Sequence, residues 1–169
     1  MSQVILHLGS NMGLRNQYLQ YARQLLERRV GKVKAASAVY ETGAWGIKDQ
    51  RDFLNQAFRL KTKLTPDEVL TAALEIEKEL GRQRKQKWGE RIIDIDLIFY
   101  GKRVLNTPHL TLPHPWLQER RFVLAPLAEI IPKWKHPLLG LKVRTLLKKC
   151  PDEGWVNRVS GWQEEESKG

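Results

Sequence analysis

Two aspartates in one predicted strand are the residues of this chain best placed to do chemistry. The stretch DIDLIFY, residues 94–100, is mostly apolar, yet a single residue separates Asp94 from Asp96. Side chains of a strand alternate between its faces, so both carboxylates point the same way, about 6.5–7 Å apart along the strand. Two like charges side by side among apolar residues are costly without a cation between them. The pair therefore predicts a cation site, although an ordinary exposed polar strand face would show the same alternation.

Mg²⁺ is the cation that suits this pair, because it binds hard oxygen ligands from one or two carboxylates together with substrate phosphates. Two such ions, about 3.5–4 Å apart, could clamp the attacking and leaving oxygens of a phosphoryl transfer. The histidines His109, His114 and His136 lack the ligand spacing of a zinc site. Neither of the common glycine-rich phosphate loops is present in the sequence.

A basic stretch just before the acidic strand could supply the phosphate contacts instead. It contains Arg82, Arg84, Lys85, Lys87 and Arg91. Guanidinium groups bind phosphate through two parallel hydrogen bonds, so we expect these arginines to neutralise a nucleotide. We also expect residues 81–90 to form a loop that closes over it. The formal net charge of +10 fits either a polyanionic partner or a merely solvated basic surface.

The elements that position these residues follow the order β-α-β-β-α-β. Periodicity and turn residues predict strands over residues 3–8, 33–40, 53–60 and 94–100, and helices over 15–29 and 66–81. A capping box from Thr65 to Glu68 marks the start of the second helix. This order predicts an α+β fold with a ferredoxin-like core, in which both helices pack on one face of an antiparallel sheet. C-terminal additions are expected as a short partner strand for the acidic strand at 104–105 and helices near 122–130 and 143–149.

Length and composition indicate one globular domain. The chain has 169 residues, 41% of them hydrophobic and 28% charged, so we expect a single domain over residues 1–160 and a frayed tail over 161–169. No apolar run reaches the roughly 20 residues of a membrane-spanning helix. The first residues do not have the pattern of a signal peptide, and a lone cysteine, Cys150, fits a reducing compartment. We therefore expect a cytoplasmic protein without membrane contact.

Three further side chains extend the candidate site. Phe53 and Asn55 share one face of the third strand and offer an aromatic plate beside an amide, which suits the edge of a heterocycle. Glu77 lies in phase with the apolar stripe of the second helix, so its carboxylate should point inward. A salt bridge to a nearby arginine is the role that we expect for it.

The stretch KWGERIIDIDLIFYG resembles the signature of the 6-hydroxymethyl-7,8-dihydropterin pyrophosphokinase family. The residues that carry the signature are Lys87, Gly89, Glu90, Arg91, Asp94 and Asp96. The similarity extends over residues 4–131 through LGSN, ETGAWG, DFLNQA, GRQR and LTLPHPWLQERRFVLAPL. It implies a ferredoxin-like core, and a reaction in which pyrophosphate moves from ATP to the hydroxymethyl oxygen of the pterin while AMP leaves.

The resemblance also implies roles for individual residues. Asp94 and Asp96 would ligate two Mg²⁺ that bridge the ATP phosphates, and would act in catalysis with Arg82 and Arg91. The ATP side would comprise Glu77, Arg82, Arg84, Trp88, Arg91, Ile95, His109, Thr111, His114 and Arg120. The pterin side would comprise Thr42, Gly43, Trp45, Phe53, Asn55, Trp88 and Phe122, with the ring sandwiched between the two phenylalanines.

This chain departs from the family pattern at several positions. Its pterin loop reads TGAW where many relatives carry a proline, and His109 replaces a common arginine. Phe53 lacks the hydroxyl of a common tyrosine. Pro115 stands where some relatives carry an aromatic residue, with Trp116 one place later. None of these changes touches the aspartate pair.

Two other functions are compatible with such a fold. A nucleic-acid-binding module would explain the positive charge and the six tryptophans, but the aromatic-rich strand typical of RNA recognition is missing. A nucleotidyl cyclase or polymerase palm would also carry metal-binding acids, but the usual acidic hairpin is absent. We expect ATP and the pterin as partners, no nucleic acid, and a monomer. The basic stretch LKVRTLLKKC is either a surface helix or a contact for another folate-pathway enzyme.

Overall fold

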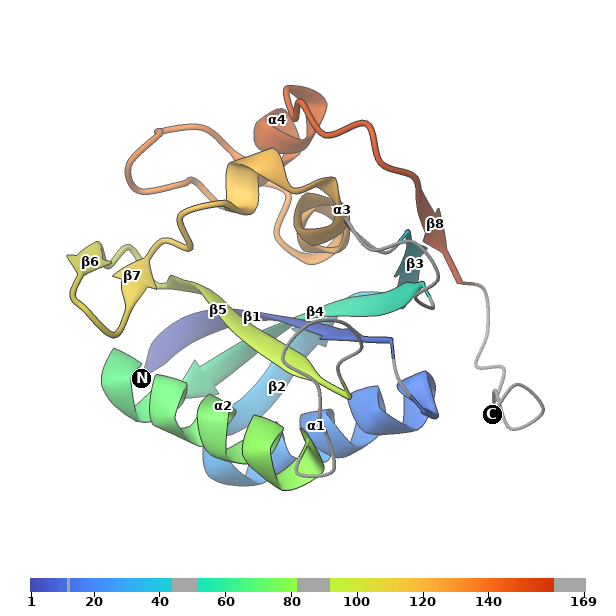
Figure 1. Ribbon diagram of the computed structural model, residues 1–169. Coiled ribbons are helices and arrows are strands. Elements are labelled where there is room, and N and C mark those ends of the chain that lie inside the picture. Colours follow the sequence, from blue (N-terminus) through green and yellow to red (C-terminus); the bar gives the residue numbers. More distant parts are fainter. Residues whose placement is uncertain (12, 44–51, 82–91, 160–169) are drawn as a thin grey trace.

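The computed structural model describes residues 1–11, 13–43, 52–81 and 92–159. An antiparallel sheet forms its centre, with β1 between β5 and β4 (Figure 1). β2 pairs with the second half of β4, β3 pairs with its first residues, and β8 pairs with β3. The strands of this sheet are β1 (Ser2–Ser10), β2 (Gly31–Ala36), β3 (Tyr40–Thr42), β4 (Phe53–Thr62), β5 (Asp94–Tyr100) and β8 (Val156–Arg158).

Helices cover both faces of the sheet. α1 (Arg15–Arg29) and α2 (Pro66–Gly81) lie on one face, as the sequence predicts (Figure 1). The C-terminal elements lie on the opposite face: the short 3₁₀ helix η1 (Leu117–Glu119), α3 (Arg121–Ile130) and α4 (Val143–Lys148). None of the helices in the described part of the chain is both long and apolar enough to cross a membrane.

Side-chain alternation along β1 separates two hydrophobic cores. Val4, Leu6 and Leu8 are fully buried and pack with α1 and α2. Ile5 points to the other face and packs with α3 and α4. Beyond Ile5 the same face continues with His7, so the part of the sheet that α3 leaves open carries polar side chains.

A bulge in β5 lets this strand serve both faces. Leu6 pairs with Leu97 and Ile5 with Phe99, which leaves Ile98 as an extra residue. Ile98 and Phe99 both pack in the core under α3, whereas Tyr100 lies in the core under α1 and α2. Strict alternation from Asp94 would have placed Tyr100 on the open face. The bulge therefore turns the Tyr100 side chain to the face opposite the two carboxylates.

Local sequence signals are confirmed at the start of α2. The backbone N–H of Thr65 donates to the Glu68 carboxylate at 2.9 Å, and the N–H of Glu68 donates to the Thr65 hydroxyl at 3.2 Å. The predicted strand over residues 33–40 is instead two strands, β2 and β3. The break occurs at Ser37, whose N–H donates to the carbonyl of Ala57.

The prediction that a strand at residues 104–105 pairs with the acidic strand is wrong. β6 (Leu105–Asn106) pairs with β7 (Thr111–Leu112) and not with β5. The chain turns away from the sheet after β5, where the N–H of Arg103 donates to the carbonyl of Tyr100. The edge of β5 receives the N–H of His114 at the carbonyl of Ile98 instead.

The core under α3 should contribute strongly to stability. Leu124 of α3 is fully buried, whereas Leu138 is 65% exposed. Leu124→Ala should lower the free energy of unfolding by about 2–5 kcal/mol because it leaves a cavity. Leu138→Ala should leave it nearly unchanged. Urea denaturation measures both, and equal midpoints for the two variants would contradict a firmly packed α3.

Candidate active site

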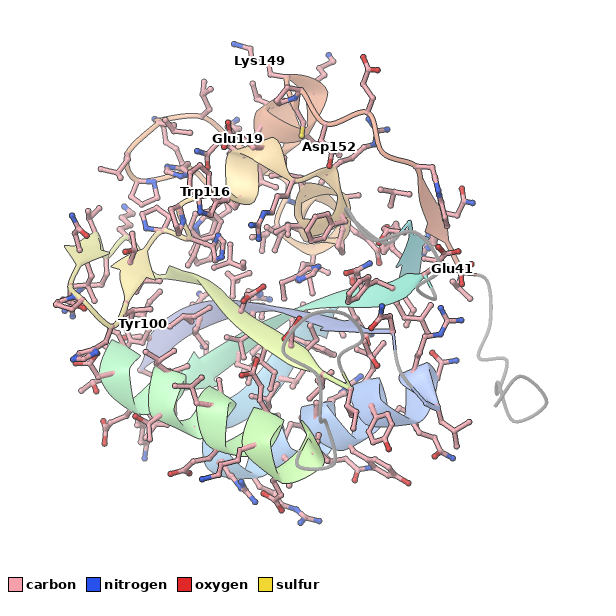
Figure 2. The ribbon with its side chains drawn as sticks, in the orientation of Figure 1. Glu41, Tyr100, Trp116, Glu119, Lys149 and Asp152 are labelled. Atoms are coloured by element: carbon pink, nitrogen blue, oxygen red, sulfur yellow. The ribbon has the colours of Figure 1, made fainter. Side chains whose placement is uncertain are left out.

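A cavity of about 720 Å³ lies between the open part of the sheet and the segment that carries η1 and α3. Figure 2 shows two of its residues, Trp116 and Glu119, on the side of the sheet opposite α1 and α2. β1, β3, β4 and β5 supply the rest of the sheet side. The lining residues are His7, Gly9, Thr42, Gly43, Phe53, Asn55, Asp94, Asp96, Trp116, Glu119, Arg120 and Phe122.

The two aspartates lie together at one side of this cavity. In the pairing of β5 with β1, Asp94 is opposite Gly9 and Asp96 is opposite His7. Both carboxylates are half-buried. Among the described lining residues the permanent cation is Arg120, on the opposite wall. The wall that carries the two aspartates is suited to a cationic ligand or a ligand that brings cations with it, because neighbouring carboxylates favour a cation between them.

Two carboxylates of this kind fit Mg²⁺ better than a transition metal. The described residues contain no group of three or more His, Cys, Asp and Glu side chains that could hold a metal ion. A protein-only cage is thus missing from the described part of the chain. Mg²⁺ commonly takes one or two protein carboxylates and completes its shell with water and substrate phosphates, which matches what Asp94 and Asp96 offer.

The aromatic side of the cavity is shaped by Gly9. A Cβ on Gly9 would lie 3.3 Å from Oδ1 of Asn55 and 3.7 Å from Cδ1 of Phe53. A larger residue here would require the Asn55 amide to shift slightly, so glycine lets this amide lie close over β1. The amide nitrogen of Asn55 donates to the Thr42 hydroxyl at 2.7 Å, and both residues are buried. The amide is thereby held in one orientation, with its oxygen on the side of Gly9.

His7 supports the opposite aromatic wall. Its ring lies edge-on to the Phe122 ring, with the centroids 5.9 Å apart, and Nε2 lies 3.2 Å from the Phe122 carbonyl. That carbonyl can only accept, so Nε2 carries the proton and donates. Burial lowers the pKa of His7 to about 4, so the ring is neutral at pH 7. The Arg120 guanidinium lies 5.9 Å from the centroid of the Phe122 ring and packs near its face.

Several predicted residues lie outside the cavity lining. Glu77 accepts a hydrogen bond from the backbone N–H of Ile95 at 2.6 Å, and the Ile95 side chain is buried in the core under α2. The expected salt bridge of Glu77 to an arginine stays a prediction. His109 is exposed next to β7, and Thr111 lies within β7.

His114 has a structural role in this arrangement. Its Nδ1 accepts the backbone N–H of Trp116 at 3.2 Å and so shapes the turn before η1. Burial, with a smaller contribution from the Arg120 charge, lowers the pKa of His114 to about 4. The ring is thus neutral at pH 7 and acts as an acceptor.

Some predicted residues fall outside the described part of the chain, and their roles stay predictions. They are Trp45, Arg82, Arg84, Trp88 and Arg91. The expected lid over residues 81–90 and the tail over 161–169 also lie outside it, apart from Gly81 at the end of α2.

Sequence reasoning missed His7, Gly9 and Glu119. The strand was expected to end at residue 8, but β1 continues to Ser10 and carries Gly9 into the sheet below Asn55. A polar His7 in an otherwise apolar strand, two residues before a glycine, was the available signal. Glu119 precedes Arg120 in a segment without periodicity, and no sequence signal separates it from a surface acid.

The pKa of His7 predicts a pH dependence of stability. Its value is near 6.5 when unfolded and about 4 when folded, so the unfolded chain binds the proton more tightly. The contribution of neutral His7 to the free energy of unfolding is therefore fully present above pH 6.5 and is lost as the pH falls towards 4. When the pH falls from 7 to 4, the free energy of unfolding should therefore decrease by about 1–3 kcal/mol less in His7→Gln than in the wild type. Unfolding in Mg²⁺-free buffer between pH 4 and 7 measures it; the exposed His109→Gln is the control, and an unchanged slope for His7→Gln would contradict the assignment.

The chain is similar to known proteins over most of its length. The family model described as 7,8-dihydro-6-hydroxymethylpterin-pyrophosphokinase (HPPK) matches residues 5–132. A 2-amino-4-hydroxy-6-hydroxymethyldihydropteridine pyrophosphokinase of Aquifex aeolicus is 44% identical over 138 residues, which are 82% of this chain and 86% of that protein. A protein of the same name from Methylorubrum extorquens is 45% identical over 160 residues, or 94% of this chain and 99% of that protein.

The fold is also found in solved structures. The chain resembles wild-type Plasmodium falciparum HPPK-DHPS with a TM-score of 0.71 and 18% identity, over 88% of this chain and 44% of that one. This chain thus spans less than half of that longer protein, and at this identity the likeness shows the fold alone. The family model, however, covers most of the chain, and the two relatives match over 86% and 99% of their length. The chain belongs to the 7,8-dihydro-6-hydroxymethylpterin-pyrophosphokinase family.

Proposed function

We propose that the cavity is the active site in which this pyrophosphokinase brings ATP and 6-hydroxymethyl-7,8-dihydropterin together. The hydroxymethyl oxygen of the pterin attacks the β-phosphorus of ATP, and the bond from that phosphorus to the α-phosphate oxygen breaks. Pyrophosphate moves as a unit, AMP leaves, and the hydroxyl proton goes to water. The observation that carries the proposal is that Asp94 and Asp96 share one cavity with two phenylalanines from opposite walls.

The acidic wall is assigned to the phosphates. Asp94 and Asp96 would hold two Mg²⁺, whose charge neutralises the triphosphate and the developing transition state when they are bound. Arg120 faces this wall and would add a fixed cation. Because His7 is neutral and buried below Asp96, it adds no charge that would compete with the metal ions. The role of these residues is alignment and charge neutralisation, which is most of what phosphoryl transfer requires.

The aromatic side is assigned to the pterin. Phe53 at the start of β4 and Phe122 at the start of α3 offer two faces for a flat ring. Asn55 is held by Thr42, so its oxygen is a fixed acceptor for an N–H of the heterocycle. The backbone at Thr42 and Gly43 lies at the same edge. Such fixed polar groups discriminate ligands well because a mismatch leaves them unpaired.

The remaining family residues complete the proposal on the ATP side and at the loops. Arg82 and Arg91 would act in catalysis. The contacts to ATP would include Glu77, Arg84, Trp88, Ile95, His109, Thr111 and His114, and Trp45 and Trp88 would reach the pterin. Ile95 can contribute through its backbone only, because its side chain lies on the opposite face of the sheet.

The finer description of the fold is part of the same proposal. The strand order β5–β1–β4–β2, with all pairs antiparallel, supports a ferredoxin-like core. The proposal also takes the enzyme to be a monomer with one domain over residues 1–160. Its free cysteine, Cys150, supports a cytoplasmic location. The fusion of HPPK with DHPS in Plasmodium falciparum supports contact with another enzyme of the pathway.

Removing one carboxylate tests the assignment of the acidic wall. Asp96→Ala should lower turnover by at least about 10²–10³-fold, because it removes a preorganised electrostatic group. The fold should survive, since Asp96 is only half-buried. The measurement is AMP formation with saturating pterin, next to a thermal unfolding curve. Asp67→Ala removes an exposed carboxylate of α2 and is the matched control. A folded Asp96→Ala protein with wild-type turnover would contradict the assignment.

A further inference from the structure

The segment Asp152–Arg158, which we call the C-terminal clasp, lies outside the residues that the family model matches. It contacts both walls of the aromatic side of the cavity. One end reaches the start of α3, next to Phe122, and the other end pairs with β3, which carries Thr42 (Figure 1). The clasp therefore connects two walls that are far apart in the sequence.

At α3 the clasp supplies a cap that the helix itself lacks. Arg120 at the N-cap position makes no side-chain capping hydrogen bond. The Asp152 carboxylate instead accepts the N–H of Arg121 at 3.0 Å with one oxygen, and the N–H of Gly154 at 2.8 Å with the other. A carboxylate at this end also interacts favourably with the helix dipole. Asp152 thus stabilises the turn that presents Phe122.

At β3 the clasp supplies a neighbouring strand. β3 has only three residues, and β8 pairs with all of them, with Val156 opposite Thr42 and Arg158 opposite Tyr40. The N–H of Val159 adds a bond to the Val39 carbonyl at 2.8 Å. Without β8, β3 would pair with β4 as its one neighbouring strand.

Trp155 packs against Gly43 at the end of the clasp that pairs with β3. A Cβ on Gly43 would lie 3.0 Å from Nε1 of Trp155 and 3.4 Å from its Cε2. The indole thus lies directly on the Gly43 backbone, and an added methyl group would have to displace it slightly. Trp155 remains 46% exposed, so the hydrophobic effect of burying the indole does not by itself explain why the side chain lies against Gly43.

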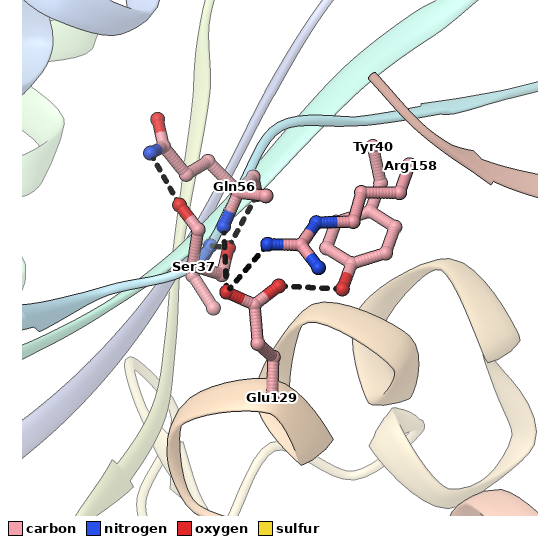
Figure 3. A network of polar contacts seen from close by, with 7 residues as sticks. Ser37, Tyr40, Gln56, Glu129 and Arg158 are labelled. Atoms are coloured by element: carbon pink, nitrogen blue, oxygen red, sulfur yellow. Dashed lines mark hydrogen bonds and ion pairs between the residues drawn. The ribbon is translucent and has the colours of Figure 1, made fainter. Parts of the chain in front are cut away.

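Glu129 of α3 links the same elements a second time. Its carboxylate accepts the Tyr40 hydroxyl at 2.6 Å and the N–H of Ala38 at 3.0 Å, and the Arg158 guanidinium lies 3.9 Å away (Figure 3). The clasp is therefore joined to α3 near both ends of the helix, at Arg121 and at Glu129, and Glu129 also joins α3 to β3. In contrast, Asp94 and Asp96 lie on β5, at the opposite edge of the sheet from β8.

From these contacts we infer that the C-terminal clasp is a positioning element for the pterin. It fixes the Phe122 wall relative to the Thr42–Gly43 wall and leaves the metal-binding wall untouched. The inference rests on the proposed function. Its consequence is a selective effect at the β3 end of the clasp: loss of Trp155 weakens pterin binding, while nucleotide binding stays intact.

Trp155→Ala tests the clasp directly. It should weaken equilibrium binding of 6-hydroxymethyl-7,8-dihydropterin about ten-fold, since small displacements of positioned groups are costly. Binding of an unreactive ATP analogue with Mg²⁺ should change by less than about two-fold, because β5 is untouched. Trp155→Phe keeps a flat ring and should recover much of the pterin affinity. Asp152→Ala should also weaken pterin binding, through the turn that presents Phe122, with the adjacent exposed acid in Glu153→Ala as the matched control.

A double variant provides a readout that does not depend on activity. Gly43→Ala should lower the thermal unfolding midpoint when Trp155 is present, because the methyl group meets the indole. The same substitution should cost clearly less in the Trp155→Ala background. Wild-type pterin affinity in Trp155→Ala, or equal losses for pterin and nucleotide, would overturn the inference. A wild-type chain that binds no pterin at all would instead overturn the proposed function, and the clasp with it.

Discussion

The alternation of side chains along β1 is the constraint on which the rest of the structure depends. Val4, Leu6 and Leu8 must face α1 and α2, because those helices bury the main core. The next residues on the other face are then Ile5, His7 and Gly9, which pass from the second core to the floor of the cavity. A shift of one residue would exchange core and site. Core packing thus fixes the face on which chemistry can occur.

The same constraint explains how the sheet can carry two carboxylates. Burying a charge is costly, so Asp94 and Asp96 must lie where α3 does not cover the sheet. Ile98, two residues after Asp96 on the same face, already packs in the second core, and the bulge adds Phe99 to that core. The site is held by rigid strands on its acidic side and by α3, β3 and the C-terminal clasp on its aromatic side. Catalysis by alignment needs such fixed walls.

Local signals in the sequence predicted the elements well. The capping box of α2 and the alternation in β5 depend only on neighbouring residues, and both are found as expected. The bulge, the pairing of β6 with β7 and the placement of α3 and α4 on the second face depend on distant partners, so periodicity could not show them. The same holds for His7, whose role comes from Phe122, 115 positions away. Among the observations on the sequence, only the family resemblance predicted that Phe53 and Phe122 contact the same ligand.

The most direct test of the central claim is an assay of the phosphate products. The wild-type protein is mixed with ATP, Mg²⁺ and 6-hydroxymethyl-7,8-dihydropterin, and AMP and ADP are followed with and without the pterin. A cavity that aligns the pterin hydroxymethyl group with the β-phosphorus predicts AMP and the pterin diphosphate, formed only when the pterin is present. ADP as the product, or AMP that forms equally well without the pterin, would contradict this account of the site.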